Sequence, residues 1–244
     1  MDNNKMYYEY ELINELTKNV LDNQAKEFSY LLSNINLGKR VLDVGCGYGR
    51  FLKILPENCM KVGIDYVISL LKQAENNCIS VRNIEFFNTD IFNFKYPMKF
   101  DTILLMGTTF GAYNTDEKNE YFLQEVVKHL NNNGKLIIDV VNKEKAVKDN
   151  ITVVTEKLND KIVRVKYFDL ITSRIKVSLI NICKEDNNII NYSYRWYGVN
   201  ELLLLLNKHN LVFTNIYGDY TCRELQDENC NPQRTIIIAE RRDI

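Results

Sequence analysis

Residues 41–49 read Val41-Leu42-Asp43-Val44-Gly45-Cys46-Gly47-Tyr48-Gly49, and this stretch decides the fold. A short apolar run that ends in glycines is typical of a buried strand, which we expect at residues 40–44, with a helix at residues 50–55. A glycine-rich turn between them lets the backbone approach a ligand and places the positive helix N-terminus beside it. Dinucleotide sites have the spacing GxGxxG, whereas these glycines alternate and Arg50 follows them. The stretch predicts a nucleoside site and does not by itself identify the nucleoside.

Acidic residues end the two strands that we expect next along the chain. Asp65, followed by Tyr66, ends the run KVGID, and Asp90, followed by Ile91, comes two residues after a third run at residues 84–88. The carboxylate of Asp65 can accept hydrogen bonds from both hydroxyls of a ribose, and that of Asp90 can accept one from an adenine amino group while Ile91 packs on the ring. Each acid alone fits a solvated loop or a helix cap equally well. Their joint placement favours a nucleoside site.

The first 150 residues alternate short β-type runs with helical patterns, which is the rhythm of a parallel α/β sheet. The helix at residues 116–130 ends in the turn Asn131-Asn132-Asn133-Gly134. The other elements that we expect are strands at residues 61–65, 84–88, 100–106 and 135–140 and a helix at residues 67–77.

The rhythm changes between residues 151 and 197, where β-type runs are separated by turn residues. We expect an antiparallel sheet of three or four strands. Alternation puts Val163, Val165 and Tyr167 on one side of their strand and Ile175, Val177 and Leu179 on one side of the next, so the sheet is expected to be apolar on one face. A helix at 199–209 and strands at 211–217 and 235–240 then resume the α/β pattern. The chain is therefore read as an α/β core, residues 1–150 and 198–244, interrupted by a β insertion at 151–197.

Taken together, these motifs resemble the class I S-adenosylmethionine-dependent methyltransferases over nearly the whole chain. VLDVGCGYG resembles the family's first motif, GIDY its ribose motif, NTDI its adenine motif, FDTILLMGTTFG its fourth strand with the loop under the methionine, and LNNNGKLIID the next turn and strand. The resemblance implies a Rossmann-like sheet of seven mostly parallel strands, the last antiparallel, and S-adenosyl-L-methionine as cofactor.

The resemblance also implies a role for each matching residue. Ribose would be bound at Asp65 with Tyr66 beside it, and adenine at Asp90 and Ile91. Met106 and Gly107 would lie under the sulfonium. The methionine end would have as neighbours Asp43, Gly45, Cys46, Gly47 and Gly49. The N-terminal segment with Tyr7, Tyr8 and Tyr10 is expected to fold over the cofactor, although it matches no fixed motif.

The insertion is similar to that of small-molecule N-methyltransferases, so we expect it to cover a small acceptor that is methylated at an amine or hydroxyl. The candidate acceptor residues are Tyr113, Tyr192, Tyr194, Arg195 and Trp196. Loop packing for Tyr113 and core packing for the aromatic stripe are the alternatives. Eight Lys and Arg against five Asp and Glu give residues 151–197 a slight positive charge. This excess fits an anionic acceptor or a solvated face.

Composition excludes several other classes of protein. A net charge of -1 provides no field for nucleic acid or a membrane surface, and the six cysteines are dispersed without the spacing of a zinc site. No long apolar segment or signal pattern is evident, so we expect a cytoplasmic transferase with reduced thiols and no metal. An RNA (tRNA) methyltransferase and a non-catalytic S-adenosylmethionine-binding protein remain as alternatives. The acceptor, the methylated atom, the use of a general base and the oligomeric state are left open.

Overall fold

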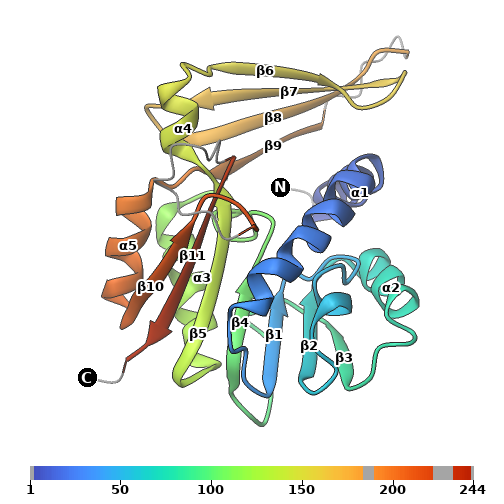
Figure 1. Cartoon of the computed structure of the whole chain (residues 1–244). Helices are drawn as coiled ribbons and strands as arrows, with labels where there is room; N and C mark the ends of the chain where they lie inside the picture. The colour runs from blue at the N-terminus through green and yellow to red at the C-terminus, as the bar shows by residue number, and fades with distance from the viewer. Residues whose placement is uncertain (1–2, 184–189, 222–232, 243–244) are drawn as a thin grey trace.

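The central feature of the computed structural model is a seven-stranded sheet (Figure 1). The backbone is described for residues 3–183, 190–221 and 233–242, and side chains within these ranges from residue 17 onward. The strand order is β10-β11-β5-β4-β1-β2-β3. β11 pairs antiparallel with both β5 and β10, and the remaining pairs are parallel. The strands are β1 (Arg40–Val44), β2 (Met60–Asp65), β3 (Ile84–Asn88), β4 (Phe100–Leu105), β5 (Leu130–Val141), β10 (Leu211–Tyr217) and β11 (Arg234–Arg241). This arrangement confirms the expected α/β class with an antiparallel last strand.

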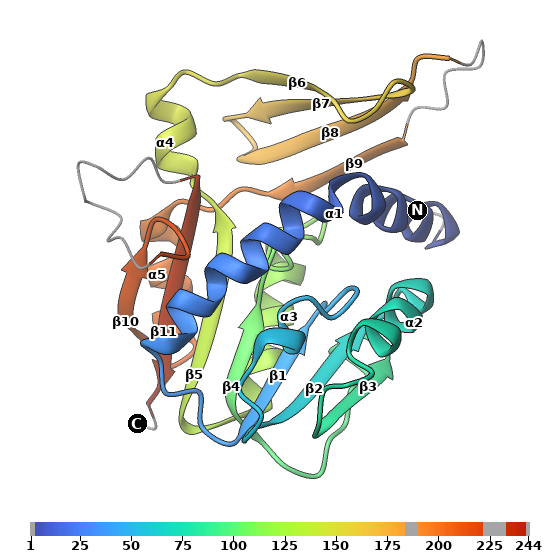
Figure 2. The same ribbon diagram turned by 45° about the vertical axis from the view of Figure 1, so that its right-hand side comes forward.

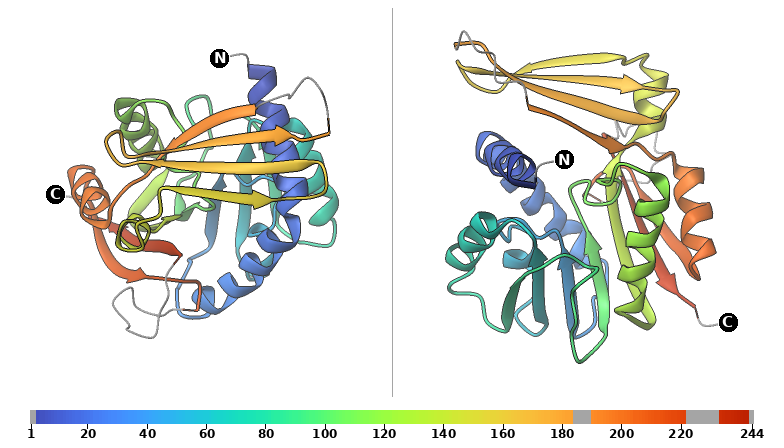
Figure 3. Two further views of the ribbon diagram at one scale, coloured as in Figure 1. Left: turned by 90° about the horizontal axis from the view of Figure 1, so that it is seen from above. Right: turned by 180° about the vertical axis from the view of Figure 1, so that it is seen from behind.

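Helices cover both faces of this sheet (Figures 1 and 3). On one face α3 (Asp116–Lys128) and α5 (Val199–Lys208) bury apolar side chains such as Phe122 and Leu202. On the other face lie α1 (Asn3–Ser33) and α2 (Ile68–Asn77), with Phe28 and Leu71 in a second core. A short helix, α4 (Lys143–Lys148), follows β5. Sandwiching a mostly parallel sheet between helices buries both of its faces.

The long helix α1 was not anticipated from the sequence. Ala25, Phe28 and Leu32 recur at helical spacing and are buried. The ring of Phe28 makes edge contacts with Phe51 and with Tyr220. The helix runs from the sheet to the underside of a second sheet (Figure 2). The side chains of Tyr7, Tyr8 and Tyr10, which were expected to fold over the cofactor, lie outside the described residues.

Two local expectations were wrong. The helix expected at residues 50–55 is only a 3₁₀ turn, Leu52–Ile54. Pro56 disfavours the helical conformation for the residue before it, and Leu55 is accordingly extended. The turn expected at residues 131–134 lies inside β5, as an irregularity between Leu130, which pairs with Phe100, and Lys135, which pairs with Thr102.

A second, antiparallel sheet lies beyond the carboxyl ends of the central parallel strands (Figures 1 and 2). Its order is β6-β7-β8-β9, which is the sequence order. The strands are β6 (Val153–Lys157), β7 (Ile162–Asp169), β8 (Arg174–Asn181) and β9 (Ile190–Arg195). The inserted antiparallel sheet of the expected fold is thus present, between the fifth and sixth strands of the core.

The sheet was expected to be apolar on one face, but the two apolar rows that predicted this lie on opposite faces. Directly opposed residues of antiparallel strands share a face. Lys166 pairs with Val177 and Phe168 with Ile175, whereas Val165 pairs with Ser178. The buried row of β8 therefore shares its face with the charged residues of β7, and Val163, Val165 and Tyr167 lie on the opposite face. The alternation of apolar and polar residues shows which side chains lie on the same side of one strand. Only the pairing register between strands shows which sides of neighbouring strands form one face of the sheet.

Candidate active site

A cavity of ≈ 210 Å³ lies at the carboxyl ends of β1, β2, β3 and β4. In an open α/β sheet this edge is where ligands bind. Among the residues proposed from the sequence, the cavity is lined by Gly45, Gly47, Asp65, Tyr66, Asp90, Ile91, Met106, Gly107 and Tyr113. Asp43, Cys46 and Gly49 do not line it. The structure thus places residues from four separate sequence motifs around one space.

The three glycines of the loop after β1 adopt left-handed backbone conformations, with φ values of 73° at Gly45, 55° at Gly47 and 79° at Gly49. Residues other than glycine are disfavoured in the left-handed region, because their Cβ atom crowds the backbone there. A Cβ atom at Gly47 would meet nothing within 4 Å, whereas one at Gly49 would lie 3.1 Å from both Ala74 Cβ and Cys78 Sγ. Gly47 therefore presents bare backbone to the cavity, and Gly49 is required for packing.

Asp65 joins the end of β2 to the glycine loop. Its Oδ2 accepts the N–H of Gly47 at 2.8 Å and its Oδ1 accepts the N–H of Val67 at 2.9 Å. Burial raises the pKa of Asp65, and the main-chain N–H groups of Val67, Gly47 and Tyr66 oppose the rise. A carboxylate has about four acceptor positions, so Asp65 keeps acceptor capacity for a ligand in the cavity. This capacity suits a ribose hydroxyl.

Asp90 has a structural role that leaves one of its oxygens available. Its Oδ1 accepts both the main-chain N–H and the side-chain amide of Asn93, each at 3.0 Å. These bonds shape the turn after β3, next to Ile91 in the cavity wall. The other oxygen can accept from an amino group.

Asp43 and Arg50 lie at the glycine-loop end of the site, where the charge of Arg50 acts on the buried carboxyl of Asp43. Asp43 is 1% exposed, and its Oδ2 has no hydrogen-bond partner among the described residues. Burial raises the pKa of Asp43 to about 7, although the positive charge of Arg50 opposes the rise. Arg50 lines the cavity and its guanidinium lies 4.5 Å from the ring centre of Phe51. A guanidinium in the cavity wall suits a ligand that carries a carboxylate.

Arg50 was not proposed from the sequence as a site residue. The sequence feature that could have identified Arg50 is its position directly after Gly49, the third glycine of the loop. A Cβ atom at Gly107 would lie 2.7 Å from Nη2 of Arg50, so the guanidinium occupies the space beside Gly107 and would have to shift for a larger residue. Cys46, which was proposed, is instead buried with its Sγ facing Gly63, and burial raises the pKa of its thiol.

The loop after β4 forms another wall of the cavity and has an unusual backbone. Gly107 has a φ of 66° and Thr108, a β-branched residue, has a φ of 72°. A left-handed β-branched residue is rare and costs about 1–3 kcal/mol unless its surroundings hold it. Here Asp139 of β5 holds it: its Oδ2 accepts the N–H of Gly107 at 2.9 Å, and its main-chain oxygen accepts the N–H of Thr108 at 3.1 Å.

Asp139 is itself the centre of a buried network that sequence reasoning did not anticipate. It accepts the hydroxyl of Tyr220 at 2.6 Å and Nε of Arg234 at 2.7 Å. Nη2 of Arg234 also donates to Oγ1 of Thr108 at 3.2 Å. Burial raises the pKa of Tyr220, and the Asp139 charge raises it further. The strained loop is thus fixed to three other segments of the chain.

The aromatic acceptor candidates of the inserted sheet do not line the cavity. Trp196 is 1% exposed and packs edge-on against Phe168, with ring centres 5.0 Å apart. Tyr192 and Tyr194 pack against the same core. Burial raises the pKa of Tyr194 to about 12, so its hydroxyl stays protonated. This placement favours the core alternative for Trp196.

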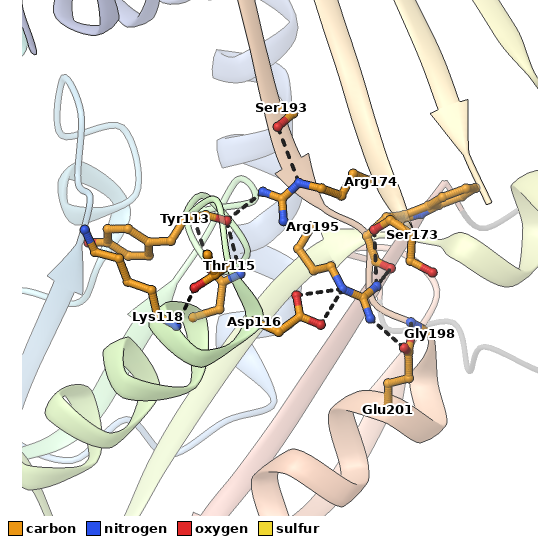
Figure 4. A network of polar contacts seen from close by, with 12 residues as sticks. Tyr113, Thr115, Asp116, Lys118, Ser173, Arg174, Ser193, Arg195, Gly198 and Glu201 are labelled. Atoms are coloured by element: carbon orange, nitrogen blue, oxygen red, sulfur yellow. Dashed lines mark hydrogen bonds and ion pairs between the residues drawn. The ribbon is translucent and has the colours of Figure 1, made fainter. Parts of the chain in front are cut away.

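Arg195, another acceptor candidate, fastens the inserted sheet to the central domain (Figure 4). Its Nε lies 3.0 Å from Oδ1 of Asp116 in α3, and its Nη2 lies 2.8 Å from Oε1 of Glu201 in α5. Its Nη1 also donates to the main-chain oxygens of Ser173 and Trp196. With its guanidinium bonded on all sides, Arg195 is placed as a structural connector.

Tyr113, which was proposed as an acceptor residue, lines the cavity on the side of β3. Its ring centre lies 5.6 Å from that of Phe92 and 5.5 Å from that of Phe122. Its main-chain N–H donates to Oδ1 of Asn119 at 3.0 Å. The ring is therefore a neighbour of the residues that follow Asp90.

Metal ligation and membrane insertion have no counterpart in the described residues. Among the side chains described, no group of three or more His, Cys, Asp and Glu is placed to hold a metal ion. Among the described helices, none combines the length and apolar character needed to cross a membrane.

The sequence of the chain is similar to those of known methyltransferases. A family model described as a methyltransferase domain matches residues 35–197. A ubiquinone/menaquinone biosynthesis C-methyltransferase from Pseudomonas fluorescens is 27% identical over 137 residues, which are 53% of this chain and 52% of the relative. The chain thus spans about half the length of the curated relatives that it matches.

Solved structures share the fold at low sequence identity. An S-adenosylmethionine-dependent methyltransferase from Clostridium acetobutylicum has a TM-score of 0.73 at 17% identity, covering 98% of this chain and 100% of the other. An amino pentose methyltransferase from Micromonospora echinaspora, involved in calicheamicin biosynthesis, has a TM-score of 0.62 at 14% identity, covering 96% of each chain. These structures have the same fold as this chain.

Proposed function

Because the chain belongs to the methyltransferase-domain family, we propose that it is an S-adenosylmethionine-dependent enzyme that methylates a small-molecule acceptor. The observation that carries the proposal is a single cavity bounded by the bare backbone of Gly47, the carboxylate of Asp65 and the turn of Asp90 and Ile91. Each matches one part of the cofactor in the order methionine, ribose and adenine.

The described side chains fit S-adenosylmethionine at both ends. Arg50 lies in the cavity wall, so its guanidinium can bind the carboxylate of the cofactor. Asp43, whose buried Oδ2 has no hydrogen-bond partner among the described residues, lies in β1, two residues before the first glycine of the loop. At the other end Ile91, Tyr113 and Phe122 provide apolar contacts for a purine. When bound, the cofactor supplies an activated methyl group, which an acceptor lone pair takes as the carbon–sulfur bond breaks toward sulfur.

The chain's own contribution to such a displacement is alignment and exclusion of water. Met106, Gly107 and Thr108 line the wall where the sulfonium is expected. Asp139 holds the backbone of that wall in a fixed position. The inserted sheet lies over the carboxyl edge of the core, where it can cover an acceptor (Figure 2). No general base is assigned.

A small acceptor is favoured over RNA. Residues 151–197 carry only a slight excess of positive charge, and the whole chain carries a net charge of -1. RNA binding depends on basic surfaces that contact phosphates. We propose an acceptor that fits between the loop after β4 and the inserted sheet, with an amine or hydroxyl as the methylated group.

Calorimetry with S-adenosylmethionine tests the cofactor assignment. We expect binding that Asp65→Ala weakens by about 1–3 kcal/mol, because ribose hydroxyls lose a charged acceptor. Asp160→Ala is the control, since that side chain is 96% exposed in the β6–β7 turn, and it should bind as the unchanged protein does. Binding of NAD without binding of S-adenosylmethionine would overturn the proposal.

Transfer of a radiolabelled methyl group tests the acceptor class. The protein is incubated with labelled cofactor, a mixture of small amines and alcohols, and total tRNA. Label in the small-molecule fraction is the expected result. Label in the RNA alone contradicts the small-molecule acceptor while leaving the cofactor assignment intact, and binding without transfer to any acceptor would indicate a non-catalytic protein.

A further inference from the structure

Tyr113 lies in the cavity wall beside the residues that follow Asp90, where adenine is expected. Its ring packs near Phe92 and Phe122, and Phe92 directly follows Ile91 in the chain. Tyr113 and Ile91 both line the cavity. An aromatic ring in this place can pack against a purine.

The main chain of Tyr113 is held by two different elements. From α3, the fully buried Asn119 accepts the N–H of Tyr113 at 3.0 Å and donates its Nδ2 to the carbonyl oxygen at 3.3 Å. From the inserted sheet, Nη2 of Arg174 donates to the same carbonyl oxygen at 2.6 Å (Figure 4). A hydrogen bond from a charged donor is about twice as strong as one between neutral groups.

Arg174 is in turn fixed within its own sheet. It begins β8, and its Nε lies 3.4 Å from Oγ of Ser193 in β9 (Figure 4). A second contact joins the inserted sheet to the loop that bears Tyr113. The N–H of Arg195 donates to the carbonyl oxygen of Gly111 at 2.7 Å. Gly111 has a φ of 98°, and a Cβ there would lie 2.7 Å from the carbonyl oxygen of Arg195. The loop that bears Tyr113 is therefore docked on the inserted sheet through its backbone.

We propose that Arg174 is a positioning residue for the adenine end of the cofactor, because it holds Tyr113 as an aromatic wall of the cavity. The inserted sheet then contributes to cofactor binding as well as covering the acceptor. This inference rests on the proposed function. It also moves Tyr113 from the acceptor site to the cofactor site.

The test uses S-adenosylhomocysteine and adenosine as probes, measured by calorimetry and by competition. In Arg174→Gln we expect both affinities to fall by on the order of tenfold, because Tyr113 loses its charged donor. Tyr113→Ala should weaken both probes in the same way. Lys176→Gln is the matched control, since Lys176 lies on the same strand and pairs with Asp169 at the surface. It should leave both affinities unchanged.

The two probes separate an effect at the adenine end from an effect at another part of the cofactor. A fall for S-adenosylhomocysteine with no change for adenosine would place Arg174 at another part of the cofactor and overturn the inference. Arg174→Lys keeps a charged donor and should restore at least part of the affinity. If Arg174→Gln does not fold, the variants Arg174→Lys and Tyr113→Ala still test the inference. Unchanged adenosine affinity in Tyr113→Ala overturns it. Absence of binding to the unchanged protein would instead count against the proposed function.

Discussion

Nε of Arg234, at the start of β11, lies 2.7 Å from Oδ1 of Asp139, close to the carboxyl end of β5. Asp139 is fully buried and the side chain of Arg234 is 18% exposed. The same carboxylate accepts the N–H of Gly107, so a single buried ion pair stabilises the core and holds the wall of the site.

Removal of the Asp139 carboxylate should therefore destabilise the whole protein. We expect Asp139→Ala to lower the free energy of unfolding by about 3 kcal/mol, because it leaves Arg234 buried without a counter-charge. Urea denaturation measures the change. Asp160→Ala, which removes the exposed partner of Lys157, is the control and should have little effect. Equal stability of the two variants would show that the buried pair contributes nothing.

Gly47 and Gly49 should respond differently to alanine although both have positive φ values. Gly47→Ala places a methyl group in the cavity, so we expect cofactor affinity to fall by at least about tenfold at a cost in stability of about 1–2 kcal/mol. Gly49→Ala meets Ala74 and Cys78 in the core as well, so its loss of stability should be larger. Thermal unfolding and calorimetry on both variants test the contrast, and equal stability losses would contradict it.

Asp43 should make stability depend on pH in the absence of cofactor. Burial raises its pKa from 3.8 to about 7, so the folded state retains a proton that the unfolded state has released. Its contribution to stability is therefore complete below pH 3.8 and is lost as the pH rises through about 7. Asp43→Asn should remove this part of the slope in urea denaturation between pH 4.5 and about 7.5. A slope that survives the substitution would assign it to other groups.

Arg50 should act at the end of the cofactor opposite to Arg174. We expect Arg50→Gln to weaken S-adenosylhomocysteine by on the order of tenfold, because the carboxylate of the ligand loses its charged donor. Adenosine has no carboxylate, and its affinity should not change. Calorimetry with both probes shows whether the two arginines have opposite patterns. Equal loss of both probes in Arg50→Gln would contradict its placement at the methionine end.

Much of the fold was predictable because its signals are local. The strands ending at Val44, Asp65 and Asn88 were placed from short apolar runs and the polar residues that stop them. Carboxyl ends of neighbouring parallel strands meet at one edge, so Gly47, Asp65 and Asp90 could be placed around one cavity before the structure was known. Local signals failed at residues 50–55, where a proline two residues after the 3₁₀ turn shortened the expected helix.

The contacts that hold the site together could not be predicted in this way. Asp139 and Arg234 are 95 residues apart, and Arg174 and Tyr113 are 61 apart. Their pairing depends on strand register and on the docking of one sheet against another, which no short stretch of sequence encodes. Strand register also decided which residues of β7 lie on the same face as the buried residues of β8, and the sequence pattern of β7 alone could not show this.

By itself, then, the sequence determined the α/β class, the inserted sheet and the place of the nucleoside loop, because periodicity and glycine spacing act over a few residues. Only the tertiary structure decided that Trp196 packs in a core, that Arg195 connects elements and that Tyr113 stands beside Phe92. These outcomes depend on which distant surfaces meet, and that is a property of packing.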